Sequence, residues 1–185
     1  SCDVALVAAG VWTAPLVADA GVALPLGTRA LQMLLTEPAP AALAPVVSAF
    51  DRKLSFKQLG SGAYLIGGGW PARILDHGAN RWELLDESVE GSLAVARAVY
   101  PSVASCPLSR GWAGLEAFGP DDLPLLGPVP GIEGLLVAAG FSGHGFALAP
   151  AIGDVLARLV LGHDARPDLW RGLRLDRVSA AITAR

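Results

Sequence analysis

The segment GLLVAAGFSGHGFALAP, from Gly134 to Pro150, decides the fold class that the sequence predicts. A short apolar run, a glycine-rich segment and then a helical pattern are typical of a buried strand, a tight turn and a helix. Glycines let the backbone approach a ligand closely, and the first turn of a helix leaves amide N–H groups unpaired. The segment alone is compatible with two interpretations, a corner that binds an electron-rich ligand or a turn that is only structural.

The composition of the chain restricts its classes of function. Of the 185 residues, 52% are hydrophobic and 17% are charged, and the formal net charge is −3. We do not expect a nucleic-acid partner, because phosphate binding needs clustered lysine and arginine and the sequence has no basic run. Cys2 and Cys106 form neither a disulfide framework nor a metal motif, so we expect no metal site and a reducing, cytoplasmic compartment. No apolar stretch reaches the roughly 18 residues of a membrane span.

Most elements before the corner are predicted as strands. The predicted strands are Asp3 to Gly10, which we expect to be buried, and then Arg29 to Glu37, Leu54 to Leu59, Ala63 to Gly67 and Leu108 to Phe118. The third and fourth form a hairpin, because a short glycine turn separates them. One or two helical turns are expected within Ala14 to Ala20, and Asp86 is expected to cap a helix that runs to about Tyr100.

An apolar helix is predicted after the glycine-rich corner and ends at Gly162. The residues that share its apolar face by spacing are Ala151, Val155, Leu156, Leu159 and Val160. The stretch from Arg166 onward is more polar, so we expect a frayed tail. The order of elements predicts a mixed α+β or α/β protein, in which one split domain flanks an inserted, mostly antiparallel sheet with a covering helix.

Four segments together resemble the carboxyl-terminal half of the D-amino acid oxidase family of FAD-dependent oxidoreductases. They are Asp3 to Trp12 (DVALVAAGVW), Tyr64 to Pro71 (YLIGGGWP), Trp112 to Gly127 (WAGLEAFGPDDLPLLG) and Gly134 to Pro150. The most similar members are glycine and sarcosine oxidases and the β-subunits of heteromeric sarcosine, opine and proline dehydrogenases. The resemblance covers most of the chain and follows the family order.

The resemblance implies a division into domains. Residues 1–24 and 116–165 would be portions of an FAD-binding, Rossmann-like domain, residues 25–115 a substrate-binding β-sheet domain and residues 166–185 a tail. The Gly-x-Gly-x-x-Gly turn that cradles the pyrophosphate in that family has no match here. The dinucleotide-binding βαβ unit is therefore expected outside these residues.

The resemblance also implies which residues contact FAD. Ala9, Gly10 and Trp12 are implied on the adenosine-diphosphate side. The turn implied at the flavin ring edge consists of Gly140, Phe141, Ser142, Gly143, His144 and Gly145. A helix start suits this place, because reduced flavin carries negative charge at that edge. We expect His144 to contact or position the flavin rather than to act as an acid or a base.

Three residues are candidates for substrate binding. Trp70 and Trp112 are implied as walls of the substrate site, and core packing of a large aromatic side chain explains each of them equally well. Glu116 stands where glycine-oxidase-like members carry an arginine that holds the substrate carboxylate. A glutamate cannot form that bidentate clamp.

Two classes of function remain open. The first is an FAD-dependent oxidation of a small amine or amino acid, with the missing amino-terminal half or a complementary subunit as partner. Leu65 and Ala147 stand where sarcosine oxidases carry oxygen-activating lysines, which favours a dehydrogenase over an oxidase. Lys57 either supplies that positive charge or is a solvated strand residue. The second class is a non-catalytic fragment or subunit domain with a scaffolding role, unable to bind FAD alone.

Overall fold

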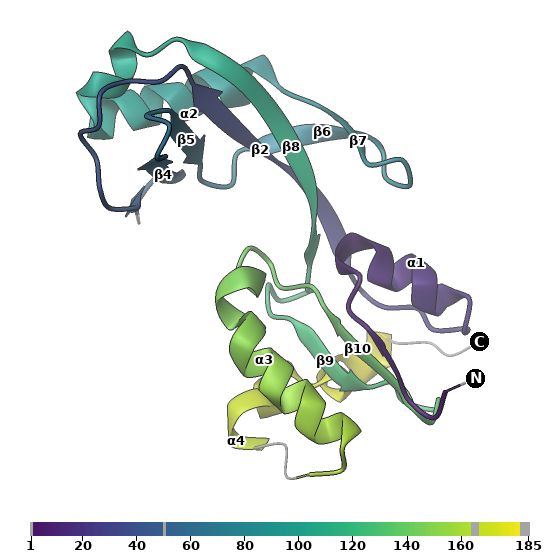
Figure 1. The fold of residues 1–185 in the computed structure, drawn as a ribbon. Coiled ribbons are helices and arrows are strands. Elements are labelled where there is room, and N and C mark those ends of the chain that lie inside the picture. Colours follow the sequence, from purple (N-terminus) through teal and green to yellow (C-terminus); the bar gives the residue numbers. More distant parts are fainter. Residues whose placement is uncertain (1, 50, 164–166, 182–185) are drawn as a thin grey trace. The chain divides into compact units, whose positions relative to one another are not determined.

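The computed structural model describes residues 2–49, 51–163 and 167–181 (Figure 1). The chain divides into two compact units, with Ser1–Thr28 and Glu116–Arg185 in unit 1 and Arg29–Leu115 in unit 2. The boundaries fall inside two long strands, β2 (Gly27–Thr36) and β8 (Leu108–Phe118). Unit 1 is therefore built from two segments that are distant in sequence.

The described part of unit 1 contains a three-stranded sheet in the order β1 (Ala5–Val7), β10 (Leu135–Ala139) and β9 (Leu125–Pro128). β1 is parallel to β10, and β10 is antiparallel to β9. Because β10 is the central strand and lies under a helix, nearly all of it is buried. This explains why its sequence is continuously apolar rather than alternating.

Helices follow both parallel strands of this sheet. The 3-10 helix η1 (Gly10–Trp12) and helix α1 (Thr13–Ala18) follow β1, and helix α3 (Gly145–Val160) follows β10. Figure 1 shows α3 running beside β9 and β10, where its Ile152 and Val155 pack with Ala138 of β10.

The predicted apolar face of this last helix is partly wrong. Ala151 and Val160 are exposed, and the buried stripe instead begins at Ile152 and continues through Val155 and Leu156. The predicted and observed stripes differ by a small rotation of the helix. Almost every position of α3 is apolar, so spacing alone could not define which face is buried.

The first strand also differs from its prediction. β1 is three residues long, and Val4 and Leu6 are 38% and 43% exposed. Within the described residues, β1 pairs with β10 on one side only. A strand at the edge of a sheet buries less of its surface, which is why an apolar sequence is exposed here.

The carboxyl-terminal segment belongs to the core of unit 1. It contains helix α4 (Pro167–Trp170) and the 3-10 helices η3 (Arg171–Leu173) and η4 (Leu175–Ala181). Trp170 and Leu175 are only 5% and 1% exposed. The expectation of a frayed tail is therefore wrong for this part, while residues 164–166 and 182–185 lie outside the described residues.

Among the described residues, unit 2 is built on a seven-stranded sheet, in which six strands follow one another as antiparallel neighbours. The order is β3 (Val47–Ala49), β4 (Leu54–Gln58), β5 (Tyr64–Gly67), β2, β6 (Pro71–Asp76) and β7 (Arg81–Glu83), and β8 pairs with β2. The predicted hairpin is confirmed as β4 and β5, in which Phe56 is paired with Ile66. The predicted fold class is thus confirmed in both its parts.

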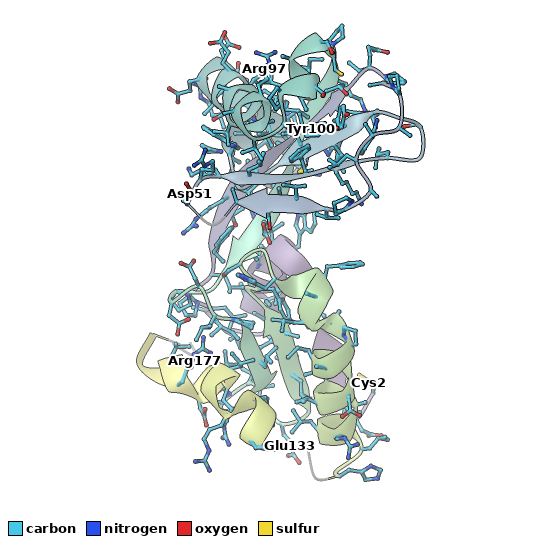
Figure 2. All side chains as sticks on the ribbon, turned by 90° about the vertical axis from the view of Figure 1, so that its left-hand side faces the viewer. Cys2, Asp51, Arg97, Tyr100, Glu133 and Arg177 are labelled. Atoms are coloured by element: carbon cyan, nitrogen blue, oxygen red, sulfur yellow. The ribbon has the colours of Figure 1, made fainter. Side chains whose placement is uncertain are left out.

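Helix α2 (Asp86–Val99) and the 3-10 helix η2 (Pro101–Ser105) cover one face of this sheet. Tyr100, labelled in Figure 2, lies with its ring 6.0 Å from the ring centre of Phe56 and 5.9 Å from that of Tyr64. Burial, together with the neighbouring Tyr100 hydroxyl, raises the pKa of Tyr64 above its usual range.

The predicted cap of helix α2 is wrong by one residue. Leu85, with an extended backbone, is the N-cap, and Asp86 is the first helical residue. The carboxylates of Asp86 and Glu87 in the first turn favour the helix through its dipole instead of through a side-chain cap.

Candidate functional site

The two segments predicted to bind FAD leave the sheet of unit 1 at the same edge. β1 and β10 are parallel neighbours, and Val7 near the end of β1 is paired with Val137. Residues 8–12 follow the first strand and residues 140–145 follow the second. Ligands of open α/β sheets bind beyond the carboxyl ends of the strands, so this edge is the candidate site.

The turn after β1 is held by a threonine that the sequence analysis missed. The amide of Ala9 donates a hydrogen bond to Thr13 Oγ1 at 3.0 Å, and the amide of Trp12 donates to the Ala9 carbonyl at 3.1 Å. Thr13 is fully buried, whereas Trp12 is 40% exposed. Gly10 has a φ of +57° and open space where a Cβ would lie. Thr13 is the first residue of α1 and accepts from an amide four residues before it, so the N-cap pattern, in which a threonine binds amides that follow it, gave no signal for this contact.

The turn after β10 is fastened to the end of β8 by Ser142. The Ser142 amide donates to the Ala117 carbonyl at 3.2 Å. Its hydroxyl donates to the Gly140 carbonyl at 3.1 Å and accepts the Gly119 amide at 3.2 Å. Ser142 is buried, with a φ of +50°, so its side chain faces the protein. Its role in the structure is to hold the turn.

Two further amides of this turn are also satisfied within the protein. Glu116 Oε1 accepts a hydrogen bond from the amide of Gly143 at 2.5 Å. The amide of His144 donates to the Phe141 carbonyl at 2.9 Å, and His144 is the N-cap residue of α3 with an exposed side chain. Neither Gly143 nor His144 therefore offers a free amide in this conformation.

The unpaired amides lie one to four residues further along the chain. The N–H groups of Gly145, Phe146 and Ala147, in the first turn of α3, have no hydrogen-bond acceptor within the described residues. Phe146 is 98% exposed, so this turn is open to solvent. A helix of 16 residues adds the positive end of its dipole. The site can bind an electron-rich group, and its donors begin at Gly145 rather than at Gly143.

The structure explains Trp70 and Trp112 by contacts within unit 2. Trp70 Nε1 donates to the Lys53 carbonyl at 2.8 Å, and a Cβ added at Gly91 of α2 would lie 2.6 Å from the Trp70 ring. The Arg110 guanidinium lies 4.9 Å from the centre of the Trp112 ring. Both rings are half-buried, so packing accounts for much of their surface.

Other candidate features contribute less to the site. Lys57 is exposed on β4, which lies between β3 and β5 and so is not an edge strand. In the described part of the chain, no group of three or more His, Cys, Asp or Glu side chains is arranged to hold a metal ion. Its helices include none that combines the length and apolar character needed to cross a membrane.

The comparisons with known proteins confirm the resemblance to this family. The sequence model of a family described as FAD dependent oxidoreductase matches residues 1–159. The chain is 33% identical over 162 residues to glycine oxidase of Pseudomonas aeruginosa, which covers 88% of this chain and 43% of that protein. It is 34% identical over 160 residues to hydrogen cyanide synthase subunit HcnC of Pseudomonas protegens, which covers 86% of this chain and 37% of that protein.

A solved structure gives the same result for the fold. The crystal structure of L-proline dehydrogenase from P. horikoshii matches with a TM-score of 0.82 and 26% identity, covering 96% of this chain and 47% of that chain. The chain therefore spans less than half the length of these relatives.

Proposed function

The chain belongs to the DAO family of FAD-dependent oxidoreductases, and we propose that it is the carboxyl-terminal half of an enzyme that oxidises the C–N bond of an amine or amino acid. The observation that carries this proposal is the shared edge of β1 and β10. Both segments implied at FAD leave the sheet there, and the unpaired amides of α3 begin at Gly145.

The residues of this edge suit the ring end of FAD. The unpaired amides at Gly145, Phe146 and Ala147 can donate hydrogen bonds to an electron-rich ring edge, and the α3 dipole favours negative charge there. When bound, FAD supplies the ring that accepts a hydride from the substrate. These 185 residues contain no Gly-x-Gly-x-x-Gly turn, which is the usual source of hydrogen-bond donors to the pyrophosphate. We propose that a preceding segment or a complementary subunit supplies them.

We propose a dehydrogenase rather than an oxidase. The resemblance implies that Leu65 and Ala147 stand where sarcosine oxidases carry the lysines that activate oxygen, and apolar side chains cannot stabilise the charge of reduced oxygen. We also propose a reducing, cytoplasmic compartment, because Cys2 and Cys106 are both free thiols. Single-turnover reoxidation separates the two activities, because a dehydrogenase reacts slowly with oxygen and quickly with a quinone or a dye.

The central test uses the FAD-loaded protein, expressed with the coding sequence upstream of these residues. Anaerobic mixing with a panel of small amines and amino acids should bleach the flavin absorbance near 450 nm for at least one substrate class. The 185-residue chain alone should purify colourless and bind FAD weakly. A loaded protein that no amine or amino acid reduces would contradict the proposal.

A scaffolding subunit is the second candidate. Unit 1 exposes the apolar side chains of Leu6, Trp12, Leu16 and Phe146, which a partner could cover. One relative, HcnC, is itself named as a subunit. Under this alternative the chain forms a stable complex in which mutations at Gly145 change neither flavin content nor turnover.

A further inference from the structure

We propose that Glu116 selects substrates by charge, with its carboxylate binding an ammonium or guanidinium group on the substrate's side chain rather than the amine that is oxidised. This inference rests on the proposed function, because under that function Glu116 lies beside the turn that would meet the flavin. The inference names the class of substrate that would bind next to this turn. It also predicts that the same residue disfavours a substrate carboxylate at this position.

The geometry of Glu116 favours a role in binding. One carboxylate oxygen, Oε1, is held at 2.5 Å by the Gly143 amide, and this contact joins residues 27 positions apart in sequence. Within the described residues, no arginine, lysine or histidine forms an ion pair with Glu116. The side chain is half-buried. It is therefore an oriented anion with an oxygen, Oε2, that is available to a donor.

The chemistry of a carboxylate defines the ligand. An ionised glutamate only accepts hydrogen bonds, and its two oxygens have about four acceptor positions, of which the Gly143 amide occupies one. Guanidinium and ammonium groups donate only, and hydrogen bonds between opposite charges are the strong ones. A substrate carboxylate placed here would face a like charge with no donor from Glu116, which is unfavourable.

The fixed orientation of the Glu116 side chain lowers the entropic cost of binding a cation. A flexible surface carboxylate loses rotamer freedom when it binds a cation, and that entropic cost reduces the gain. In this site the Gly143 amide already restricts the side chain, because the turn that carries it is itself fastened by Ser142. Binding of a cation therefore costs less ordering than at an isolated glutamate.

Two substitutions separate the charge of Glu116 from its hold on the turn. Glu116→Gln retains a side-chain oxygen that can accept the Gly143 amide, and it removes the negative charge. Glu116→Ala removes both. The matched control is Glu133→Gln, which changes the net charge of the protein by the same amount. Glu133 is exposed in the same unit, in the turn that precedes β10 (Figure 2).

The first measurement needs no turnover. Butylammonium and butyrate are titrated as matched cation and anion against the ¹⁵N-labelled protein, with and without bound FAD. Butylammonium should shift the amide resonance of Gly143 in the wild type and in Glu133→Gln, and the shift should be lost in Glu116→Gln. Butyrate should leave that resonance unchanged. An equal response to both ions, or a response that survives in Glu116→Gln, overturns the inference.

The second measurement compares arginine with norvaline as substrates of the FAD-loaded protein, because their side chains differ chiefly in the guanidinium group. One charge-assisted hydrogen bond predicts a preference in kcat/KM for arginine of about tenfold or more. Glu116→Gln should abolish the preference through KM, and Glu133→Gln should preserve it. An unchanged preference in Glu116→Gln overturns the inference. If no amine reduces the flavin at all, the proposed function fails, and the titration still decides the role of Glu116.

Discussion

Val7 and Val137 are paired residues of two parallel neighbouring strands, and this pairing sends two distant segments to one edge of a sheet. If both segments contact FAD, binding should protect both of them together. We expect slower hydrogen exchange in peptides that contain Ala9 to Trp12 and Gly145 to Ala147 when FAD-loaded protein is compared with FAD-stripped protein. The turn from Val129 to Gly134, at the opposite edge of the sheet, is the internal control. Protection of only one segment would contradict a shared site.

Ser142 should contribute to the stability of unit 1 through its hydroxyl. Ser142→Ala removes the hydrogen bonds to Gly140 and from Gly119, so unfolding free energy should fall by about 1–2 kcal/mol. Ser142→Gly loses the same bonds but relieves the φ of +50°, and should cost less. Chemical denaturation measures both. Ser48→Ala, at an exposed position of β3, should change stability little, and equal losses in all three variants would contradict this role for the hydroxyl.

The sequence predicted helix α2 and four of the seven strands that the structure describes in the sheet of unit 2, β2, β4, β5 and β8, because their signals are local, and it did not predict β3, β6 or β7. The hairpin of β4 and β5 follows from alternation and a glycine turn, and the long strand β8 has the predicted bounds, Leu108–Phe118. The buried face of α3 was not predictable from spacing, because apolar residues surround that helix. Burial there depends on which side meets the sheet.

The position of the glycine-rich turn was predicted, but its contacts were not. The glycine-rich segment identified the turn after β10. The partners of that turn, Ala117 and Glu116, lie at the end of another strand, so only the fold brings them to Ser142 and Gly143. Sequence spacing carries no information about a contact between residues 27 positions apart, and so it could not show that the Gly143 amide is already satisfied.

Trp170 should stabilise unit 1 by packing rather than by hydrogen bonding. Its indole N–H is buried and has no acceptor within the described residues, and its ring packs on Gly127, where an added Cβ would lie 2.9 Å away. Trp170→Ala should lower unfolding free energy by about 3–5 kcal/mol. Trp170→Phe retains an aromatic ring and loses no hydrogen bond, so thermal denaturation should show a clearly smaller loss. Equal losses would indicate an essential partner for the indole.

The ion pair between Asp121 and Arg177 should make unit 1 sensitive to acid. Arg177, labelled in Figure 2, donates to Asp121 at 2.9 Å, and this hydrogen bond holds the pKa of Asp121 below its usual value. The stabilisation is present above the unfolded-state pKa of about 4 and is lost as the pH falls through the lower folded-state pKa. The carboxylate is partly exposed, so the effect is at most about 1 kcal/mol.

Thermal melts between pH 6 and pH 3 measure this contribution. The melting temperature of Asp121→Asn should fall less with acid than that of the wild type, because the variant has no carboxylate to protonate at this position. Asp19→Asn, at an exposed residue after α1, is the control and should follow the wild type. Identical pH profiles for the wild type and Asp121→Asn would show that the pair contributes nothing.

Gly145 provides the sharpest test of the flavin-facing turn. Its φ is ordinary, and a Cβ there would lie 3.2 Å from Phe141 Cβ, so alanine fits with a small adjustment whereas valine would be strained. A methyl group beside the first unpaired amide of α3 should disturb an approaching ring. We expect Gly145→Ala to slow flavin reduction in the FAD-loaded protein by about tenfold or more, as for loss of one preorganised donor.

The control is Gly153→Ala, in the same helix with open space where its Cβ would lie, which should leave the rate of flavin reduction unchanged and raise the free energy of unfolding by up to about 1 kcal/mol. Stopped-flow reduction and melting temperature are measured on the same preparations, because a purely structural turn predicts a lower melting temperature with an unchanged rate per folded molecule. That result for Gly145→Ala would end the assignment of this turn to the flavin edge.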